Sequence, residues 1–284
     1  MFEAFEPAFM QRALLAGLLA VVATSVIGTW VVLRGLAFLG DALSHGVIPG
    51  IALAVLWGFS PIIGALVAAA VMAGMVTLVS ADSTVREDTG IGLLFVGMLS
   101  LGVVIVSKAR SFATEVTSLL FGDVLAVTRD DLVSQVIATI VVLVVSTILY
   151  RPFLALTFNT QKAQSLGMRP GLAHLGMMVL LAISIVASFQ TVGTLLVFGL
   201  LVGPPATASL VTTRIPVMML VSALFGAVAV VAGLTISFHY GTAGGATMAG
   251  LSVAQFFVVL AVIRIARLVR PVPDPGDPSE LAPA

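Results

Sequence analysis

Long stretches without any charged side chain are the feature that most constrains this chain. Asp, Glu, Lys and Arg are absent from six long segments, namely residues 13–33, 42–81, 89–107, 132–150, 170–213 and 215–263. One helical crossing of a bilayer needs about 20 apolar residues. The three longest segments must therefore each hold two helices. The total is nine spans, or eight if one segment is short or re-entrant.

Composition agrees with this count of spans. Hydrophobic residues make up 60% of the chain and charged residues only 9%, against about a quarter charged in soluble proteins. Apolar segments that cross lipid must be helices, because lipid offers no partner for a free backbone amide. We therefore predict an all-α, polytopic membrane protein with eight or nine transmembrane helices in a transmembrane domain covering residues 1–270. The formal net charge is zero and no basic block occurs, which argues against nucleic acid as a partner.

The chain's breaker residues predict where the doubled segments turn. Ser60-Pro61 is expected to divide the second segment, residues 191–193 the fifth, and the Gly-rich run 241–245 the last. Basic residues near Arg151 and Arg264 predict that these regions face the cytoplasm. Nine spans then place the N-terminus outside. Residues 271–284 are rich in proline and poor in apolar side chains, which predicts a disordered cytoplasmic tail.

Two ionisable residues enter the second apolar segment from its N-terminal side. Asp41 and His45 are four positions apart, so on a helix both side chains lie on one face. A carboxylate with an imidazole suits zinc, and the harder manganese ion also accepts this pair. The chain has no cysteine, so thiolate metal sites are excluded. An alternative interpretation makes Asp41 an N-terminal helix cap and His45 an interfacial residue.

Residues 153–170 form the longest polar stretch between two spans. Asn159-Thr160 can cap a short helix that runs from Gln161 through Lys162 and Ala163 to Leu166 and ends at Gly167. One interpretation of this helix is an interfacial connector. The other is a docking element for a cytosolic partner.

Several sequence pieces of this chain occur together in one known family. The most specific is the run from Val32 to His45, which contains Gly-Asp-Ala-Leu-Ser-His. The other pieces are Gly90-Ile-Gly-Leu, Leu-Leu-Phe-Gly-Asp-Val-Leu at 119–125, residues 163–167, Gly-Thr-Leu-Leu-Val at 193–197, Pro-Pro-Ala-Thr-Ala at 204–208 and Ser-Phe-His-Tyr at 237–240. From about Phe9 to Arg267 the chain resembles the membrane permease subunits of the manganese/zinc-type ABC importers.

The resemblance implies a type II-like ABC importer permease in the inner or plasma membrane of a prokaryote. Its expected partners are a second copy of itself in a homodimer, a cytosolic ATP-binding subunit, an extracytoplasmic metal-binding protein and membrane lipid. The expected cargo is a divalent metal ion, zinc, manganese or iron, with no permanently bound cofactor.

The resemblance also implies roles for the residues already singled out. Asp41 and His45 become a translocation site, and His239 becomes a third candidate ligand. The short helix at 161–167 becomes a coupling helix that contacts the ATPase. The turn after His239 reads Gly-Thr-Ala where family members often carry Asp or Ser, so no further ligand is expected there.

The sequence also bears on other possible functions of the chain. The sequence contains no Gly-x-x-x-x-Gly-Lys-Ser/Thr motif, so the chain is not expected to hydrolyse ATP or to be an enzyme. One rival within transport is a permease for an iron chelate or vitamin. A rival of another kind is a proton-coupled secondary carrier that uses Asp41 and His45 as a relay. Such carriers usually have two related halves, and the Gly-Asp-Ala-Leu-Ser-His run occurs once.

Overall fold

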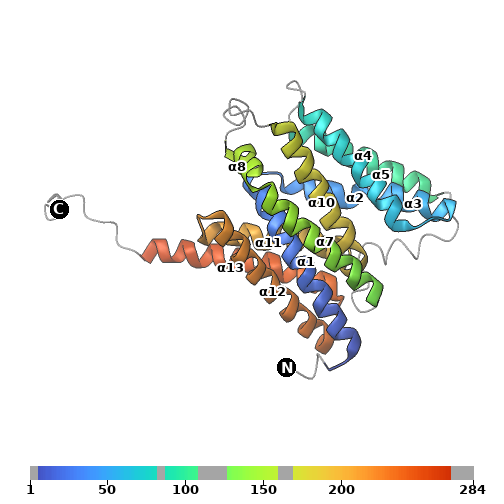
Figure 1. The fold of residues 1–284 in the computed structure, drawn as a ribbon. Helices are drawn as coiled ribbons and strands as arrows, with labels where there is room; N and C mark the ends of the chain where they lie inside the picture. The colour runs from blue at the N-terminus through green and yellow to red at the C-terminus, as the bar shows by residue number, and fades with distance from the viewer. Residues whose placement is uncertain (1–5, 82–86, 108–126, 159–168, 270–284) are drawn as a thin grey trace.

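The computed structural model describes residues 6–81, 87–107, 127–158 and 169–269. Within these ranges the chain forms helices and no strands, which confirms the predicted all-α class (Figure 1). The helices are α1 (Ala8–Leu33), α2 (Ala37–Gly46), α3 (Ile48–Trp57), α4 (Pro61–Ala81), α5 (Glu87–Ser107), α7 (Arg129–Ile148), α8 (Tyr150–Phe158), α10 (Pro170–Val192), α11 (Thr194–Val211), α12 (Ile215–Tyr240) and α13 (Gly244–Val269).

The number of membrane-crossing segments agrees with the sequence. Among the described residues, eight helical segments are long and apolar enough to cross a bilayer, and α2 and α3 together count as one of them. A ninth, shorter apolar stretch lies in α11, at Leu196–Val211. The expectation of eight or nine spans is thus confirmed, with α11 as the short one.

The predicted breaks lie where the helices end. Gly58 ends α3 with φ +74°, and Pro61 begins α4. Gly193 (φ +79°) separates α10 from α11, and Gly241 (φ +64°) ends α12. These backbone conformations are accessible to glycine at little cost, because it has no Cβ.

Two features of the helices were not predicted. A break at Val47 separates α2 from α3, and Pro49 stands in the first turn of α3, where its missing N–H is tolerated. The second feature is the short helix α8, which begins directly after α7 at residues that the sequence analysis assigned to the end of a span. Both arise at prolines, Pro49 and Pro152, and an X-Pro step favours a helix boundary.

Helix α1 lies at the centre of the bundle. It packs against α7, α10, α11 and α12, and two thirds of its most apolar window is buried. Trp30, near its C-terminal end, is fully buried, and the rings of Tyr150 and Phe153 approach it edge-on at 5.5 and 5.7 Å. These aromatic contacts connect α8 to the central helix, each contributing about 0.5–1.5 kcal/mol beyond area burial.

Close backbone contacts hold several helix pairs together. A Cβ added at Gly64 on α4 would collide with the carbonyl oxygen of Gly50 on α3, and the reverse also holds. A Cβ at Gly28 would collide with the carbonyl oxygen of Leu201 on α11. Without a hydrophobic driving force between helices in lipid, small residues that permit such approach are a principal source of packing energy.

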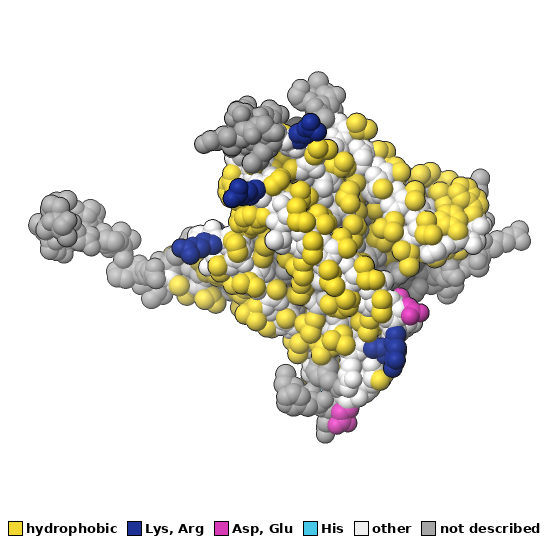
Figure 2. Space-filling model, viewed as in Figure 1, with side chains coloured by type: hydrophobic (Ala, Val, Ile, Leu, Met, Phe, Trp, Pro, Cys, Tyr) yellow, Lys and Arg dark blue, Asp and Glu magenta, His cyan; other side chains and the backbone are white. Residues whose placement is uncertain are grey.

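The outer surface of the bundle is apolar. Large hydrophobic side chains on α5, α7 and α13 are more than one third exposed, as expected for helices that face lipid. Figure 2 shows hydrophobic side chains over most of one face, with the charged side chains at its ends. The start of α1 and helix α8 lie at opposite ends of the bundle in Figure 1. The predicted coupling helix at 161–167 and the predicted tail at 271–284 lie outside the described residues.

Candidate functional site

Helix α2 presents both residues of the predicted ion site. It begins at Ala37, so Asp41 lies in its second turn and His45 in its last turn. The residue at the N-cap position is Leu36, and no side chain forms a cap hydrogen bond there. The interpretation of Asp41 as a helix cap is therefore wrong, because the helix starts one turn earlier than the charge-free segment does.

The two side chains face each other. His45 Nε2 lies 3.4 Å from Asp41 Oδ1, as expected for positions i and i+4 of one helix. The two side chains are 26% and 27% exposed, so they are accessible within a largely apolar span. Ionisable groups at such depth are costly and mark transport pathways and other functional sites.

Aromatic side chains fix the imidazole of His45. The ring of Phe95 on α5 meets it edge-to-face with centroids 5.7 Å apart, and Phe38 stacks on Phe95 in the same way at 5.6 Å. His45 Nδ1 is buried and has no hydrogen-bond partner among the described residues. The ring thus buries one nitrogen behind aromatic surface and directs the other towards Asp41.

The opposite side of α2 is tightly packed. Leu39, Ala42 and Leu43 are fully buried, and a Cβ added at Gly40 would collide with the side chain of Leu201 on α11. The hydroxyl of Ser44 donates to the carbonyl oxygen of Gly40 at 2.8 Å, which satisfies this polar group within the helix. These contacts hold α2 against α11, so the face with the ionisable pair stays directed away from the core.

This geometry suits a divalent metal ion as cargo. His45 Nε2 and Asp41 Oδ1, 3.4 Å apart, are close enough for one divalent ion to contact both. Coordination through Nε2 requires the neutral ring, with its proton on Nδ1.

His239, the third candidate ligand, lies on a different part of the bundle. It is exposed near the C-terminal end of α12, which packs against α1, α11 and α13. Its Nδ1 donates to the carbonyl oxygen of Thr235 at 2.8 Å, because a carbonyl can only accept, so Nε2 is left with its lone pair. No group of three or more His, Cys, Asp or Glu side chains that could hold a metal ion occurs within the described ranges. The structure therefore brings Asp41 and His45 together and forms no three-residue cluster that includes His239.

A partly buried polar contact between α1 and α10 was not predicted. Arg34, the C-cap of α1, directs Nη1 to Nδ1 of His174 on α10 at 2.9 Å. Arg can only donate, so His174 accepts at Nδ1 and carries its proton on Nε2. His174 is buried, with 6% of its surface exposed. The signal that could have indicated this contact is Arg34 itself. It is the single Arg between two apolar helices, and a basic residue there needs a polar partner.

Known proteins resemble this chain along nearly its whole length. The sequence pattern of the ABC 3 transport family matches residues 6–263. The chain is 40% identical over 240 residues to the manganese transport system membrane protein MntC of Halalkalibacterium halodurans, covering 84% of this chain and 82% of that relative. It is 36% identical over 251 residues to the manganese import system permease protein ScaB of Streptococcus parasanguinis, covering 88% and 89%. Among solved structures, PsaBC from Streptococcus pneumoniae in complex with Fab matches with a TM-score of 0.83 and 30% identity, over 95% of this chain and 98% of that chain.

Proposed function

The chain belongs to the ABC 3 transport family, and on this basis we propose that it is the membrane-spanning permease subunit of an importer for a divalent transition-metal ion. The members of this family are membrane subunits of ABC transporters and are not themselves enzymes. Hydrolysis of ATP is assigned to a separate cytosolic subunit, since the sequence contains no phosphate-binding loop of its own.

The pair of Asp41 and His45 carries the proposal. A dication cannot enter a medium of low dielectric without its water, because the desolvation cost is tens of kcal/mol by Born estimates. One carboxylate oxygen and one imidazole nitrogen, 3.4 Å apart and partly exposed, replace some of that water inside the span. Few ligands are an advantage here, since a permeation site must also release its ion.

Manganese is the ion that we favour. Relatives at 40% and 36% identity are named as manganese transport proteins. A carboxylate is a hard ligand that suits manganese, and an imidazole tolerates it. Zinc and iron remain the competing ions, and both accept the same two ligand types.

The proposed assembly has three further proteins. A second copy of this chain forms a homodimer, so that the path for the ion lies between two permeases. A cytosolic ATP-binding subunit docks on the segment with Gln161, Lys162, Ala163, Leu166 and Gly167. An extracytoplasmic protein delivers the ion. His239, near the outer end of α12, contacts the ion as it enters. The assembly lies in the inner or plasma membrane of a prokaryote, which agrees with the bacterial sources of the relatives.

Uptake by the reconstituted complex tests the site. We expect Asp41→Ala and His45→Ala each to lower ATP-driven ⁵⁴Mn uptake into proteoliposomes by at least ~10–100-fold. Loss of a residue that only supports a metal ligand already costs a metal site that much, and these two residues are themselves the proposed ligands. Insertion and assembly should be unchanged, because the backbone of α2 satisfies its own hydrogen bonds. Asp88→Ala is the matched control, since Asp88 is an exposed carboxylate at the start of α5.

Two results would contradict the proposal. Uptake at the wild-type rate in both the Asp41 and the His45 variant would remove these residues from the ion path. Uptake that needs a proton gradient and no ATPase would place the chain among secondary carriers. Competition by zinc and iron against ⁵⁴Mn in the wild-type complex ranks the three ions in the same assay.

A further inference from the structure

A groove lies on the lipid-facing side of the bundle, between α7 and α12. Both helices pack on α1, which forms the floor of the groove. Its volume is about 700 Å³, within the ~300–1,000 Å³ range of small-molecule sites. Residues from all three helices and from the start of α8 line it, among them Val26, Leu143, Ser146, Arg151, Met219 and Leu220.

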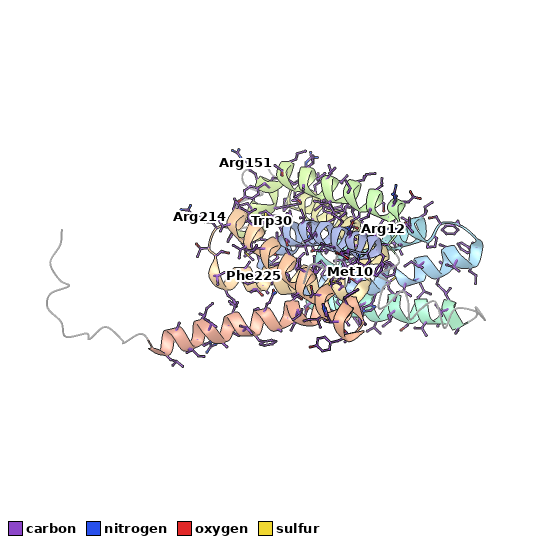
Figure 3. The ribbon with its side chains drawn as sticks, turned by 90° about the horizontal axis from the view of Figure 1, so that it is seen from below. Met10, Arg12, Trp30, Arg151, Arg214 and Phe225 are labelled. Carbon is purple, nitrogen blue, oxygen red and sulfur yellow. The ribbon has the colours of Figure 1, made fainter. Side chains whose placement is uncertain are left out.

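The lining combines an apolar wall with a basic end. Leu143 and Leu220 are 37% and 73% exposed, so the groove opens towards the hydrocarbon region of the membrane. Arg151 also lines it and is exposed at the beginning of α8. Arg214, the N-cap residue of α12, lies at the same end of the bundle, as Figure 3 shows. An apolar groove with one lining guanidinium, and a second guanidinium at the same end of the bundle, matches an amphiphile with an anionic head.

A buried polar atom also lines the groove. Ser146 is 4% exposed, and its Oγ has no hydrogen-bond partner among the described residues. The neighbouring Thr147 hydroxyl donates to the carbonyl oxygen of Leu143 at 2.7 Å. Ser25, Ser184 and Ser222 also have a buried Oγ without a partner among the described residues, but of these four serines only Ser146 lines the groove. A buried hydroxyl left without a partner destabilises the fold, because its lost hydration is not replaced. An ester oxygen of a bound lipid would supply the missing acceptor.

We propose that this groove binds an anionic glycerophospholipid of the cytoplasmic leaflet. One acyl chain lies along Leu143, Met219 and Leu220, the ester region reaches Ser146, and the phosphate meets Arg151. Arg suits this role because its planar fork binds two phosphate oxygens at once. Basic pockets between transmembrane helices on the cytoplasmic side are typical sites for anionic headgroups.

The proposed lipid site is separate from the proposed ion site. Asp41 and His45 lie on α2 and pack towards α5, whereas α1, α7, α8 and α12 form the groove. The lipid proposal therefore does not depend on which ion is transported. Loss of lipid binding and loss of the ion site can be measured on different variants.

Native mass spectrometry of the purified full chain tests the lipid site. The probes are palmitoyl-oleoyl phosphatidylglycerol, the matching phosphatidylcholine, and glycerol 3-phosphate. We expect the wild-type chain to prefer phosphatidylglycerol, and Arg151→Gln to weaken that binding about fivefold, the effect of one Arg near an anionic surface. Binding of phosphatidylcholine by this variant should be unchanged. Arg264→Gln is the matched control, because Arg264 is an exposed Arg on α13 that does not line the groove.

A second variant tests the apolar part of the groove. Ser146→Met fills the groove beside α1, and we expect it to weaken binding of both phospholipids. Three results would overturn the proposal. They are equal loss in the Arg151 and Arg264 variants, displacement of the lipid by glycerol 3-phosphate alone, and capture of a protein rather than lipid by a photo-crosslinker at Leu220→Cys. The chain has no native cysteine, so this label is unique.

Discussion

The contact between α3 and α4 allows a sharp test of the packing, because α4 contains two glycines in different surroundings. A Cβ at Gly64 would stand 2.6 Å from the Cβ of Ala54 and closer still to the carbonyl oxygen of Gly50. Ordinary contact between two such carbon atoms begins at 3.4 Å, so the Cβ of Gly64→Ala would lie 0.8 Å too close to the Cβ of Ala54. A Cβ at Gly74 would meet nothing within 4 Å. The same substitution therefore probes close packing at one position and helix propensity alone at the other.

We expect the two substitutions to change the free energy of unfolding in opposite directions. Overpacking costs about 1–3 kcal/mol, while replacing a helical Gly by Ala contributes about 1 kcal/mol of propensity. We expect Gly64→Ala to lower the free energy of unfolding by up to about 2 kcal/mol, and Gly74→Ala to leave it unchanged or raise it by up to about 1 kcal/mol. Reversible unfolding of the purified chain in mixed detergent micelles, followed by far-UV circular dichroism, measures both values.

The outcome for the two variants decides the argument. If Gly64→Ala and Gly74→Ala had equal stabilities, close approach of α3 to α4 would not be a source of stability. The helices pack by van der Waals contact rather than by exclusion from water, so even a shift of about 1 Å removes much of the attraction.

Four further substitutions test other parts of the chain. His239→Ala should lower ⁵⁴Mn uptake less than either change in the α2 pair, since the exposed ring lies in no three-ligand group of the described residues; equal loss would make it a full ligand. Ala163→Glu and Gly167→Val should abolish transport-coupled ATP hydrolysis while metal binding by the isolated permease survives; unchanged ATPase activity would leave that segment an interfacial connector. Thr128→Ala removes the capping box with Asp131 at the start of α7 and should lower the free energy of unfolding by about 1 kcal/mol. An unchanged midpoint in chemical denaturation would contradict this value.

The spans were predictable because lipid leaves the chain few choices. Residues without charge over about 20 positions must cross as helices, and the breaks at Pro61, Gly193 and Gly241 follow from backbone geometry that is local in sequence. The family was predictable for a similar reason, since the run that ends at His45 combines an acid, an imidazole and small residues in an apolar setting.

Other features depended on contacts that the sequence does not display. The start of α2 at Ala37 placed Asp41 inside a helix rather than at its cap, because the packing of Leu39 and Leu43 extends the helix upstream of the charge. The partner of His174 is Arg34, 140 positions away, and no local pattern connects them. Pairings of this kind are set by which helices become neighbours, and that depends on the whole bundle.

The break between α2 and α3 has an electrostatic consequence for an ion beside His45. In an unbroken helix, the residue at position 49 would donate its N–H to the carbonyl oxygen of His45, and Pro49 has no N–H to give. His45 thus lies at the C-terminal end of α2, where the last carbonyl groups carry partial negative charge, and the N-terminal end of α3, which begins at Ile48, offsets part of it. We expect the remaining partial charge at this break to favour a cation over an anion beside His45.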